Sequence, residues 1–334
     1  MPPRPLAIVT GGAGFIGSHM VDLLLDRGFR VHVIDNMAGG HAANLAQHRG
    51  NADLVLAERD VRSLEPADPL FAGATHVFHF AGIGDIVPSI ERPRDYMSVN
   101  VQGTVHVLEA ARDAGVRKLV YAASSSCYGL AAVPTREDHP IAPQYPYALS
   151  KYLGEQAALH WHQVYGLPLN SIRIFNAYGT RSRTSGAYGA VFGVFLRQKL
   201  AGRPFTVVGD GTQRRDFIYV TDVALAFLLA AETDHVGQVY NLGAGNPQSI
   251  NRLTELLGGG VVHLPKRPGE PGVTWADIGK IRAGLGWEPQ VSFEDGVKRI
   301  LADIDYWQAA PLWDPDSIAK ATRLWFATLN RGER

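Results

Sequence analysis

The chain has 334 residues, 46% of them hydrophobic, which suggests one large α/β unit or two lobes with a full core. Its 32 basic and 32 acidic side chains cancel, so there is no basic surplus for binding nucleic acid or an anionic membrane. A single cysteine, Cys127, excludes an intrachain disulfide and a cysteine metal cluster, and the twelve histidines show no metal-ligand spacing.

The first half alternates short apolar runs with segments of helical periodicity. This alternation predicts an α/β fold with a doubly wound parallel sheet of the Rossmann type. The predicted strands are 6–10, 30–34, 54–57, 75–80, 118–123 and 170–175, and the main predicted helices are 15–27, 96–114 and 146–165.

The pattern loosens after about residue 176, where glycine, proline and arginine become frequent. Helices are predicted at 191–201, 220–231 and 249–257, within a smaller lobe interleaved with the end of the sheet. A last helix, 316–329, carries apolar Ile318, Leu324, Trp325 and Phe326. We expect it to pack on the body of the protein; a contact with a partner is the less favoured interpretation.

A glycine-rich turn, Gly11-x-x-Gly14-x-x-Gly17, joins the first strand to the first helix. Gly11 permits the tight turn, Gly14 allows a pyrophosphate to approach the backbone, and Gly17 allows close packing of helix on sheet. Asp35 ends the second strand and can accept hydrogen bonds from an adenosine ribose. It would repel a 2′-phosphate, so NAD is favoured over NADP. Asp60 ends the third strand, where it either accepts from the adenine amino group or forms an ordinary turn.

Tyr147 and Lys151 are four residues apart, so they lie on one face of a helix. A nearby lysine charge favours the phenolate and would lower the pKa of Tyr147. Such a phenol can act as a base or acid for a sugar hydroxyl.

Several motifs coincide along the chain. They are Gly11-x-x-Gly14-x-x-Gly17, Asp60-Val61, His79-Phe80-Ala81-Gly82, Asn100, Ser124-Ser125-Ser126-Cys127-Tyr128-Gly129 and Tyr147-x-x-x-Lys151. With them, the chain resembles the extended short-chain dehydrogenase/reductase family. Within that family it is most similar to nucleotide-sugar epimerases of the UDP-glucose 4-epimerase type, from about residue 6 to about residue 305.

The resemblance implies a catalytic role for Ser124, Tyr147 and Lys151. Tyr147 would take the proton of the sugar 4-hydroxyl while hydride passes to NAD, Lys151 would bind the nicotinamide ribose, and Ser124 would hydrogen-bond the sugar oxygen. It implies an NAD-binding Rossmann domain over residues 1–176 and a mainly substrate-binding lobe over 177–334, with segments returning to the first domain. The implied NAD contacts are Gly11, Gly14, Phe15, Ile16, Gly17, Asp35, Asn36, Asp60, Val61, Phe80, Ala81, Gly82, Asn100, Tyr147 and Lys151.

The residues at positions 124–126, all serines here, differ between members of this family that catalyse different reactions. Related 4,6-dehydratases have Thr-Asp-Glu there, and decarboxylating relatives have a glutamate. Without a carboxylate at these positions, dehydration lacks its acid, which favours 4-epimerisation. A 4-ketoreductase or dehydratase is the runner-up, and an NAD-binding scaffold or sensor is the non-enzyme alternative. Ser125 and Ser126 either touch the sugar or fill the pocket wall, and Cys127 is expected to be buried and inert.

The resemblance also implies a UDP-sugar site. Asn176, Arg215 and Arg267 would bind the diphosphate, Glu270 the nucleotide ribose, and Asp216 would orient Arg215. Thr274 occupies the position that gates the sugar pocket, and its small size predicts tolerance of N-acetylhexosamines. Arg181 or Arg183 could instead meet a uronate, as in a UDP-glucuronate 4-epimerase, although a surface charge is favoured for each. Gly84 stands where simple galactose epimerases often have a lysine near the pyrophosphate.

The helices near 96–114 and 148–165 correspond to a dimer interface in relatives, so a homodimer is expected. Val101, Val105 and Leu108 either contribute to it or face the sheet. No bound metal is expected. No apolar run reaches membrane-spanning length and no signal peptide is recognised, so a cytoplasmic location without membrane contact is expected.

Overall fold

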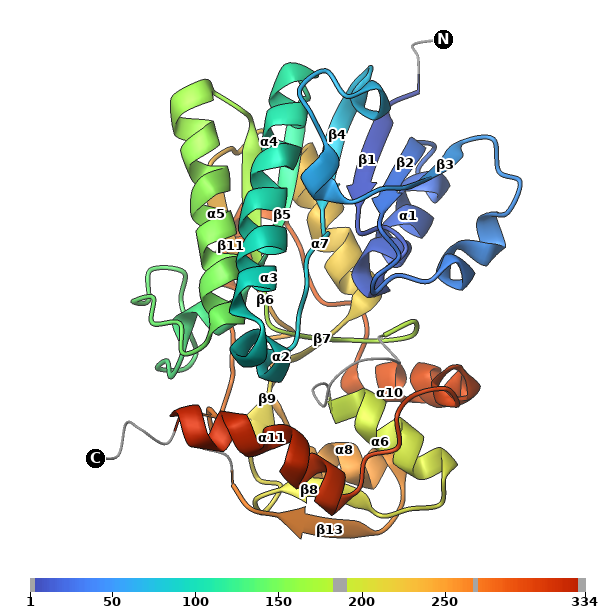
Figure 1. Ribbon diagram of the computed structural model, residues 1–334, viewed down its shortest axis with the longest axis vertical. Coiled ribbons are helices and arrows are strands. Elements are labelled where there is room, and N and C mark those ends of the chain that lie inside the picture. The colour runs from blue at the N-terminus through green and yellow to red at the C-terminus, as the bar shows by residue number, and fades with distance from the viewer. Residues whose placement is uncertain (1–3, 183–190, 267–269, 330–334) are drawn as a thin grey trace.

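The computed structural model describes residues 4–182, 191–266 and 270–329. A seven-stranded parallel sheet lies at its centre, between two layers of helices (Figure 1). In spatial order the strands are β11 (Gln238–Leu242), β6 (Leu169–Ile174), β5 (Lys118–Ser124), β4 (Ala74–His79), β1 (Leu6–Thr10), β2 (Arg30–Asp35) and β3 (Leu54–Glu58). The predicted doubly wound sheet is confirmed, and its edge strand β11 comes from the second half of the chain.

Both faces of this sheet are covered. The covering helices are α1 (Phe15–Asp26), α7 (Val220–Glu232), α4 (Gly103–Asp113) and α5 (Pro146–Tyr165). Ala7 and Val9 of β1 join the core on the side of α1 and α7, whereas Leu6 and Ile8 join the core on the side of α4. Alternate side chains of a strand point to opposite faces of the sheet, and both faces are covered here. All five residues of β1 are therefore buried, which explains the apolar run in its sequence.

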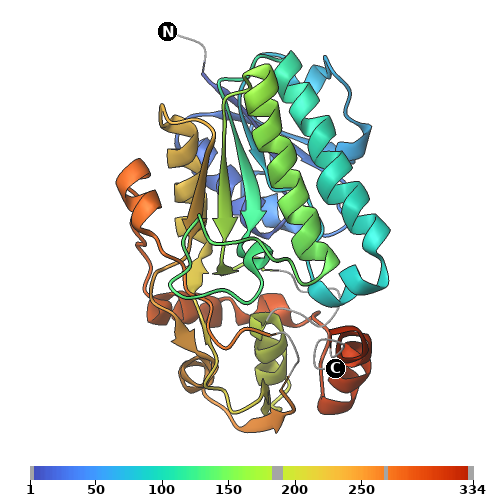
Figure 2. The ribbon, with the colours of Figure 1, turned by 90° about the vertical axis from the view of Figure 1, so that its left-hand side faces the viewer.

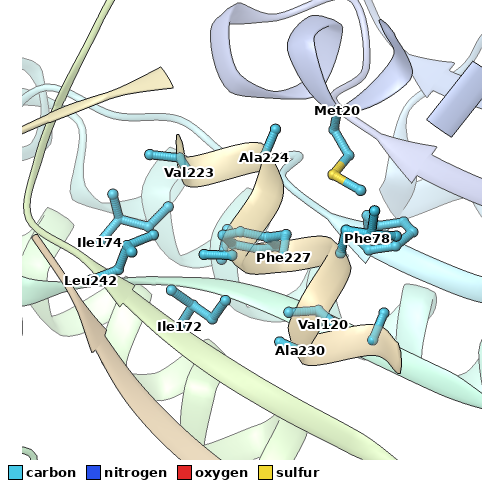
Figure 3. Close-up of a cluster of buried hydrophobic side chains, with 14 of the residues drawn as sticks. Met20, Phe78, Val120, Ile172, Ile174, Val223, Ala224, Phe227, Ala230 and Leu242 are labelled. Atoms are coloured by element: carbon cyan, nitrogen blue, oxygen red, sulfur yellow. The ribbon is translucent and has the colours of Figure 1, made fainter. Parts of the chain in front are cut away.

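Phe227 of α7 lies at the centre of one of these cores (Figure 3). Its side chain is fully buried, with Met20 of α1, Phe78 of β4 and Ile172 of β6 around it. A helix from the second half of the chain therefore completes the core of the first half. The chain enters the smaller lobe and returns to the sheet, as the sequence predicts.

The segment predicted as one helix over 96–114 is divided. It consists of α3 (Pro93–Met97), the π-helical turn η4 (Ser98–Gln102) and α4, preceded by α2 (Ile86–Glu91). A π-turn inside a helix is frequent at functional sites. Here it carries Asn100, and the apolar periodicity of the sequence contains no signal for it. The other short helices near the sheet are η1 (Ala42–His48), η2 (Val61–Ser63), η3 (Pro69–Phe71) and η5 (Ser125–Tyr128).

The smaller lobe lies below the carboxyl ends of the strands (Figure 2). Its helices are α6 (Val191–Leu200), α8 (Ile250–Leu257), α10 (Phe293–Ala302), η6 (Ile304–Trp307) and α11 (Pro315–Leu329), while α9 (Gly279–Leu285) packs on β11. Three two-stranded sheets join β7 (Asn176–Tyr178) to β10 (Phe217–Tyr219), β9 (Arg214–Arg215) to β12 (Gln248–Ser249), and β8 (Phe205–Val208) to β13 (Val261–Leu264). These strands are two to four residues long, too short to show a periodicity in the sequence.

Helix α11 packs on the body, as expected. Ile318, Thr322 and Trp325 are buried, whereas Leu324, one of the apolar residues of the predicted helix, is 40% exposed. Among the described residues, no helix is long and apolar enough to cross a membrane.

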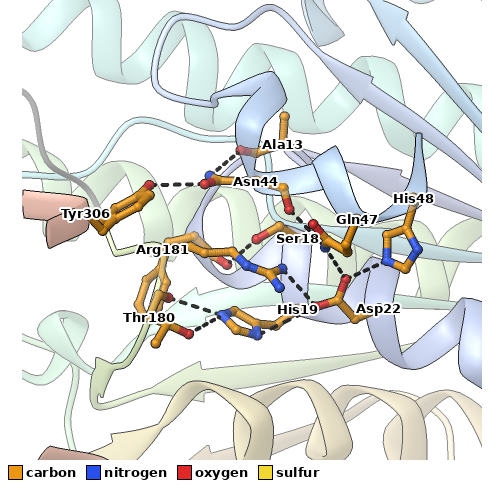
Figure 4. A network of polar contacts seen from close by, with 11 residues as sticks. Ala13, Ser18, His19, Asp22, Asn44, Gln47, His48, Thr180, Arg181 and Tyr306 are labelled. Carbon is orange, nitrogen blue, oxygen red and sulfur yellow. Dashed lines mark hydrogen bonds and ion pairs between the residues drawn. The ribbon is translucent and has the colours of Figure 1, made fainter. Parts of the chain in front are cut away.

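A polar network links α1 to the smaller lobe (Figure 4). Asp22 pairs with Arg181 at 2.8 Å and with His48 at 2.7 Å, and the Tyr306 hydroxyl donates to the Asn44 side chain at 3.0 Å. Burial, with the Arg181 charge, lowers the pKa of His19 to about 4, so this histidine is neutral. Arg181 is thus a structural ion-pair partner, and Arg183 lies outside the described residues.

Candidate active site

A cleft of about 1140 Å³ lies between the carboxyl ends of the strands and the smaller lobe. It runs from the glycine turn after β1, past Tyr147, to Arg215 and Thr274 of the smaller lobe. Pockets for one small molecule usually measure about 300–1,000 Å³. The cleft is therefore larger than a usual pocket for one small molecule.

The glycine turn at one end has the geometry that the sequence predicts. Gly11 has a φ of +70°, which favours glycine, and a Cβ there would lie 2.7 Å from the Ala81 nitrogen. A Cβ on Gly17 would collide with the carbonyl of Gly11. Helix α1 begins after Gly14 with no side-chain cap, so its first N–H groups are available to an anion in the cleft. These residues fit a pyrophosphate.

Asp35 lies beside this turn and lines the cleft. Its carboxylate accepts hydrogen bonds from the backbone N–H of Ala13 at 3.0 Å and of Met37 at 2.9 Å. Burial raises its pKa, and these two N–H groups oppose the rise. Because a carboxylate offers about four lone-pair sites, acceptor capacity is left for a ribose.

Asp60 lines the cleft, but its carboxylate is already engaged. Arg62 donates to both carboxylate oxygens, at 2.9 and 2.7 Å, and Asn36 donates to one at 2.9 Å. The Arg62 side chain holds the pKa of Asp60 well below its usual range. Asp60 therefore anchors Arg62 and Asn36, which also line the cleft, and its contact with adenine stays a prediction.

Asn100 is the only described residue of the predicted NAD set that does not line the cleft. It is buried; its amide accepts from the Ile83 N–H and donates to the Ile83 carbonyl and to the Ser150 hydroxyl. It thus ties the Gly82–Ile83 segment, which lines the cleft, to α5. These bonds give Asn100 a positioning role, and its expected direct contact with NAD stays a prediction.

Tyr147, Lys151 and Ser124 line the cleft together. Tyr147 and Lys151 are on one face of α5, and Ser124 is the last residue of β5. The Ser124 hydroxyl shares a hydrogen bond of 2.8 Å with Ser126. Burial raises the pKa of Tyr147, and a hydrogen bond with Ser124 opposes the rise.

The expected lowering of the Tyr147 pKa by Lys151 is wrong for this geometry. The Lys151 ammonium lies 4.6 Å from the centre of the Tyr121 ring, and burial lowers its own pKa to about 8, opposed by Glu155. At Tyr147 the largest effect is burial, which raises the pKa, and the Lys151 charge is not among the causes of the shift. Glu155 lies one turn further along α5 and pairs with Arg173 at 2.6 Å, both of them buried.

The serine segment contains no carboxylate, and its residues Ser125 and Ser126 line the cleft. Cys127 is buried, and desolvation raises its pKa to about 12, as expected for an inert thiol.

The predicted sugar-nucleotide residues form two pairs in the far half of the cleft. Arg215 donates to Glu270 at 2.7 Å, and the Thr274 hydroxyl donates to Asn176 at 2.7 Å. All four line the cleft, whereas Arg267 lies outside the described residues.

Asp216 does not orient Arg215, contrary to expectation. It is fully buried and accepts backbone N–H bonds from Ala244, Gly245 and Ala276. Its role is to join two loops of the smaller lobe, because a buried carboxylate needs such donors.

Four residues that the sequence reasoning missed also belong to the site. Asp85, Tyr145 and Trp325 line the cleft, and the Tyr96 hydroxyl donates to the carbonyls of Gly84 and Asp85. The charge of Asp85 contributes to raising the pKa of Tyr147. Asp85 and Tyr96 carried no motif; Tyr145, two positions before Tyr147, was the only one whose spacing offered a signal.

A parallel sheet with this glycine turn, and a tyrosine and lysine beside it, defines a dinucleotide-binding protein of the oxidoreductase-like class. The sequence pattern of the NAD dependent epimerase/dehydratase family matches residues 7–243. The chain belongs to this family, and NAD is its cofactor.

Known relatives match nearly the whole chain. A putative UDP-glucose 4-epimerase of Methanocaldococcus jannaschii is 34% identical over 305 residues, 89% of this chain and 97% of the relative. The structure of a UDP-N-acetylglucosamine 4-epimerase from Methanobrevibacter ruminantium, in complex with UDP-N-acetylmuramic acid, is 31% identical. It has a TM-score of 0.84 and covers 90% of this chain and 99% of its own. A Bacillus cereus UDP-glucuronic acid 4-epimerase, solved with UDP-glucuronic acid and NAD, is 30% identical, with a TM-score of 0.84 and the same coverage.

Proposed function

We propose that the protein catalyses the NAD-dependent 4-epimerisation of a UDP-sugar through a 4-keto sugar. The observation that carries this proposal is the common cleft wall of Ser124, Tyr147 and Lys151, which lies between the glycine turn and Arg215. The name of the family covers both epimerases and dehydratases. The serines at 125 and 126 favour epimerisation, because they supply no acid for the loss of water.

When bound, NAD supplies reversible hydride transfer at C4 of the sugar. Tyr147 accepts the proton of the 4-hydroxyl and later returns it to the same oxygen. Ser124 hydrogen-bonds Tyr147 and holds the sugar oxygen beside it, and Lys151 holds the nicotinamide ribose. On this proposal the 4-keto sugar turns over in the cleft between the two hydride transfers.

Arg215 and Glu270 would bind the diphosphate and the uridine ribose. In the structure they form an ion pair, and Arg215 also donates to the Pro271 carbonyl. A bound diphosphate would share the guanidinium with Glu270. Asn176 would donate to the same diphosphate while its side-chain oxygen accepts from Thr274.

The sugar is proposed to be a hexose or an N-acetylhexosamine. Thr274 lines the cleft, is small and donates its hydroxyl to Asn176, so this position itself adds no bulky side chain to the cleft. The uronate alternative is less supported, because Arg181 pairs with Asp22 on α1 and does not line the cleft.

The substrate test uses purified protein with added NAD and three separate sugars: UDP-galactose, UDP-N-acetylgalactosamine and UDP-galacturonate. Proton NMR should detect the 4-epimer of one or both of the first two. A 4-keto-6-deoxy product, or net consumption of added NADH, would instead establish a dehydratase or a ketoreductase. Binding of NAD with all three sugars unchanged would favour the scaffold or sensor alternative.

A homodimer through α4 and α5 is also proposed. Leu149 and Leu153 of α5 are each 38% exposed, and Tyr165 is 49% exposed, so α5 offers an apolar surface. Leu108, considered above for this interface, instead faces the sheet and is fully buried. Light scattering should give twice the mass of one chain, and Leu153→Glu should give the monomer. The expected cytoplasmic location stays a prediction, which cell fractionation would test.

A further inference from the structure

The C-terminal helix α11 has no part in the function proposed above. The similarity to the two solved epimerases described above includes 99% of each of their chains but only 90% of this chain. Part of this chain therefore has no counterpart in them. The motifs of the sequence resemblance end near residue 305, whereas α11 spans Pro315–Leu329. A side chain of this helix nevertheless reaches the cleft.

That side chain is Trp325. It is 6% exposed and lines the cleft, and its ring centroid lies 6.5 Å from that of Tyr145. The Tyr145 ring lies 6.5 Å from the ring of Tyr147, with only 6° between the two planes. Three aromatic rings therefore form a row along the cleft, from the proposed base to α11.

Tyr145, the middle ring of the row, also has polar neighbours. Burial raises the pKa of Tyr145, and Tyr147 and Glu270 contribute to the rise while a hydrogen bond with Ser126 opposes it. Tyr145 and Glu270, one of the proposed nucleotide-binding residues, both line the cleft.

Trp325 is held in place from two sides. Ile318, seven residues earlier on α11, is 3% exposed and belongs to the apolar core of the smaller lobe. Helix α11 also packs against α2, which begins directly after Asp85, a residue of the cleft wall. The helix thus presents the indole to the cleft from a fixed position.

We propose that Trp325, with Tyr145, forms an aromatic wall of the sugar subsite and helps to determine which sugar binds. The proposal rests on the function proposed above, which puts the sugar 4-hydroxyl at Tyr147. The C–H face of a hexose ring, or the methyl group of an N-acetyl substituent, would pack on these rings. Aromatic rings supply a large and rigid apolar contact for such groups.

The test compares variants of the full-length, NAD-loaded protein. Trp325→Ala removes the ring, Trp325→Phe keeps an aromatic face, and Trp325→Leu keeps apolar packing if the alanine variant does not fold. Leu324→Ala is the matched control, because Leu324 is the neighbouring residue on α11 and is 40% exposed. The measurements are kcat and KM for UDP-galactose and UDP-N-acetylgalactosamine, and the dissociation constants of both sugars and of NAD by calorimetry.

Trp325→Ala should raise the KM and dissociation constant of at least one sugar about tenfold, with kcat changed less than about threefold, in line with loss of one aromatic contact. The Kd of NAD should stay unchanged, Trp325→Phe should restore most of the sugar affinity, and Leu324→Ala should match the unmodified protein. Equal sugar affinities for the alanine variants at 324 and 325 would overturn the aromatic wall and leave the proposed function standing. An unmodified protein that binds NAD but neither sugar would overturn both.

Discussion

The two halves of the cleft are built by different means. The NAD half is made mainly of backbone: the Gly11 turn, the uncapped start of α1 and the ends of neighbouring parallel strands. The half proposed to bind the sugar is lined by side chains from distant parts of the chain, such as Tyr145 of the segment before α5, Arg215 of β9 and Trp325 of α11. Backbone geometry leaves a compact motif in the sequence, whereas an assembly of distant side chains leaves none.

The largest expected effect falls where the two halves meet, at Tyr147. Tyr147→Phe should lower kcat about 10²–10⁴-fold, because it removes the group that handles the proton of the sugar hydroxyl. NAD affinity should change little. The matched control is Tyr165→Phe, at the exposed end of the same helix. Undiminished epimerisation by Tyr147→Phe would contradict the assigned role.

A change in the NAD half should act on cofactor binding and on stability together. A Cβ on Gly17 would meet the backbone of Gly11 and Gly12, and overpacking of this kind typically destabilises by about 1–3 kcal/mol. Gly17→Ala should therefore weaken NAD binding and lower the melting temperature. Gly272→Ala is the control, since a Cβ there meets nothing within 4 Å. Normal NAD affinity in Gly17→Ala would show that this close approach does not shape the cofactor site.

A change in the sugar half should spare NAD. Arg215→Lys removes the planar fork that suits a diphosphate and should raise the KM for the UDP-sugar about tenfold, with NAD affinity unchanged. Arg214→Lys is the control, because the Arg214 guanidinium donates to the Pro247 carbonyl. If Arg215→Lys weakens NAD binding instead, the division of the cleft into two halves is wrong.

The smallest expected effect is a shift in pH dependence. The negative charge of Asp85 contributes to raising the pKa of Tyr147. Asp85→Asn removes that charge, so the Tyr147 pKa should fall and the acidic limb of the kcat/KM profile should move to lower pH. A profile of kcat/KM against pH measures this shift. A limb that stays in place, or moves to higher pH, would show that Asp85 does not act on the base.

Three polar residues singled out in the sequence form their hydrogen bonds within the protein. Asp60 bonds to Arg62, Asn100 to Ser150, and Asp216 to the Ala276 N–H instead of orienting Arg215. The NAD contacts expected of Asp60 and Asn100 stay predictions. A motif identifies a polar residue near the site. It does not show whether the hydrogen bonds of that residue go to a ligand or to a nearby arginine, amide or N–H group of the protein. The pKa of Tyr147 likewise depends on burial, which raises it and which the spacing of Tyr147 and Lys151 does not reveal.

The sequence by itself determined the parallel sheet, the glycine turn, the carboxylate of Asp35 and the placement of Tyr147 and Lys151 on one helix face. These depend on local backbone geometry and on periods of two and 3.6 residues, which short stretches of sequence encode. Only the tertiary structure decided that β11 completes the sheet, that Arg215 pairs with Glu270, and that Trp325 enters the cleft. Those contacts join residues far apart in the chain, and they follow from packing the whole molecule rather than from any one segment.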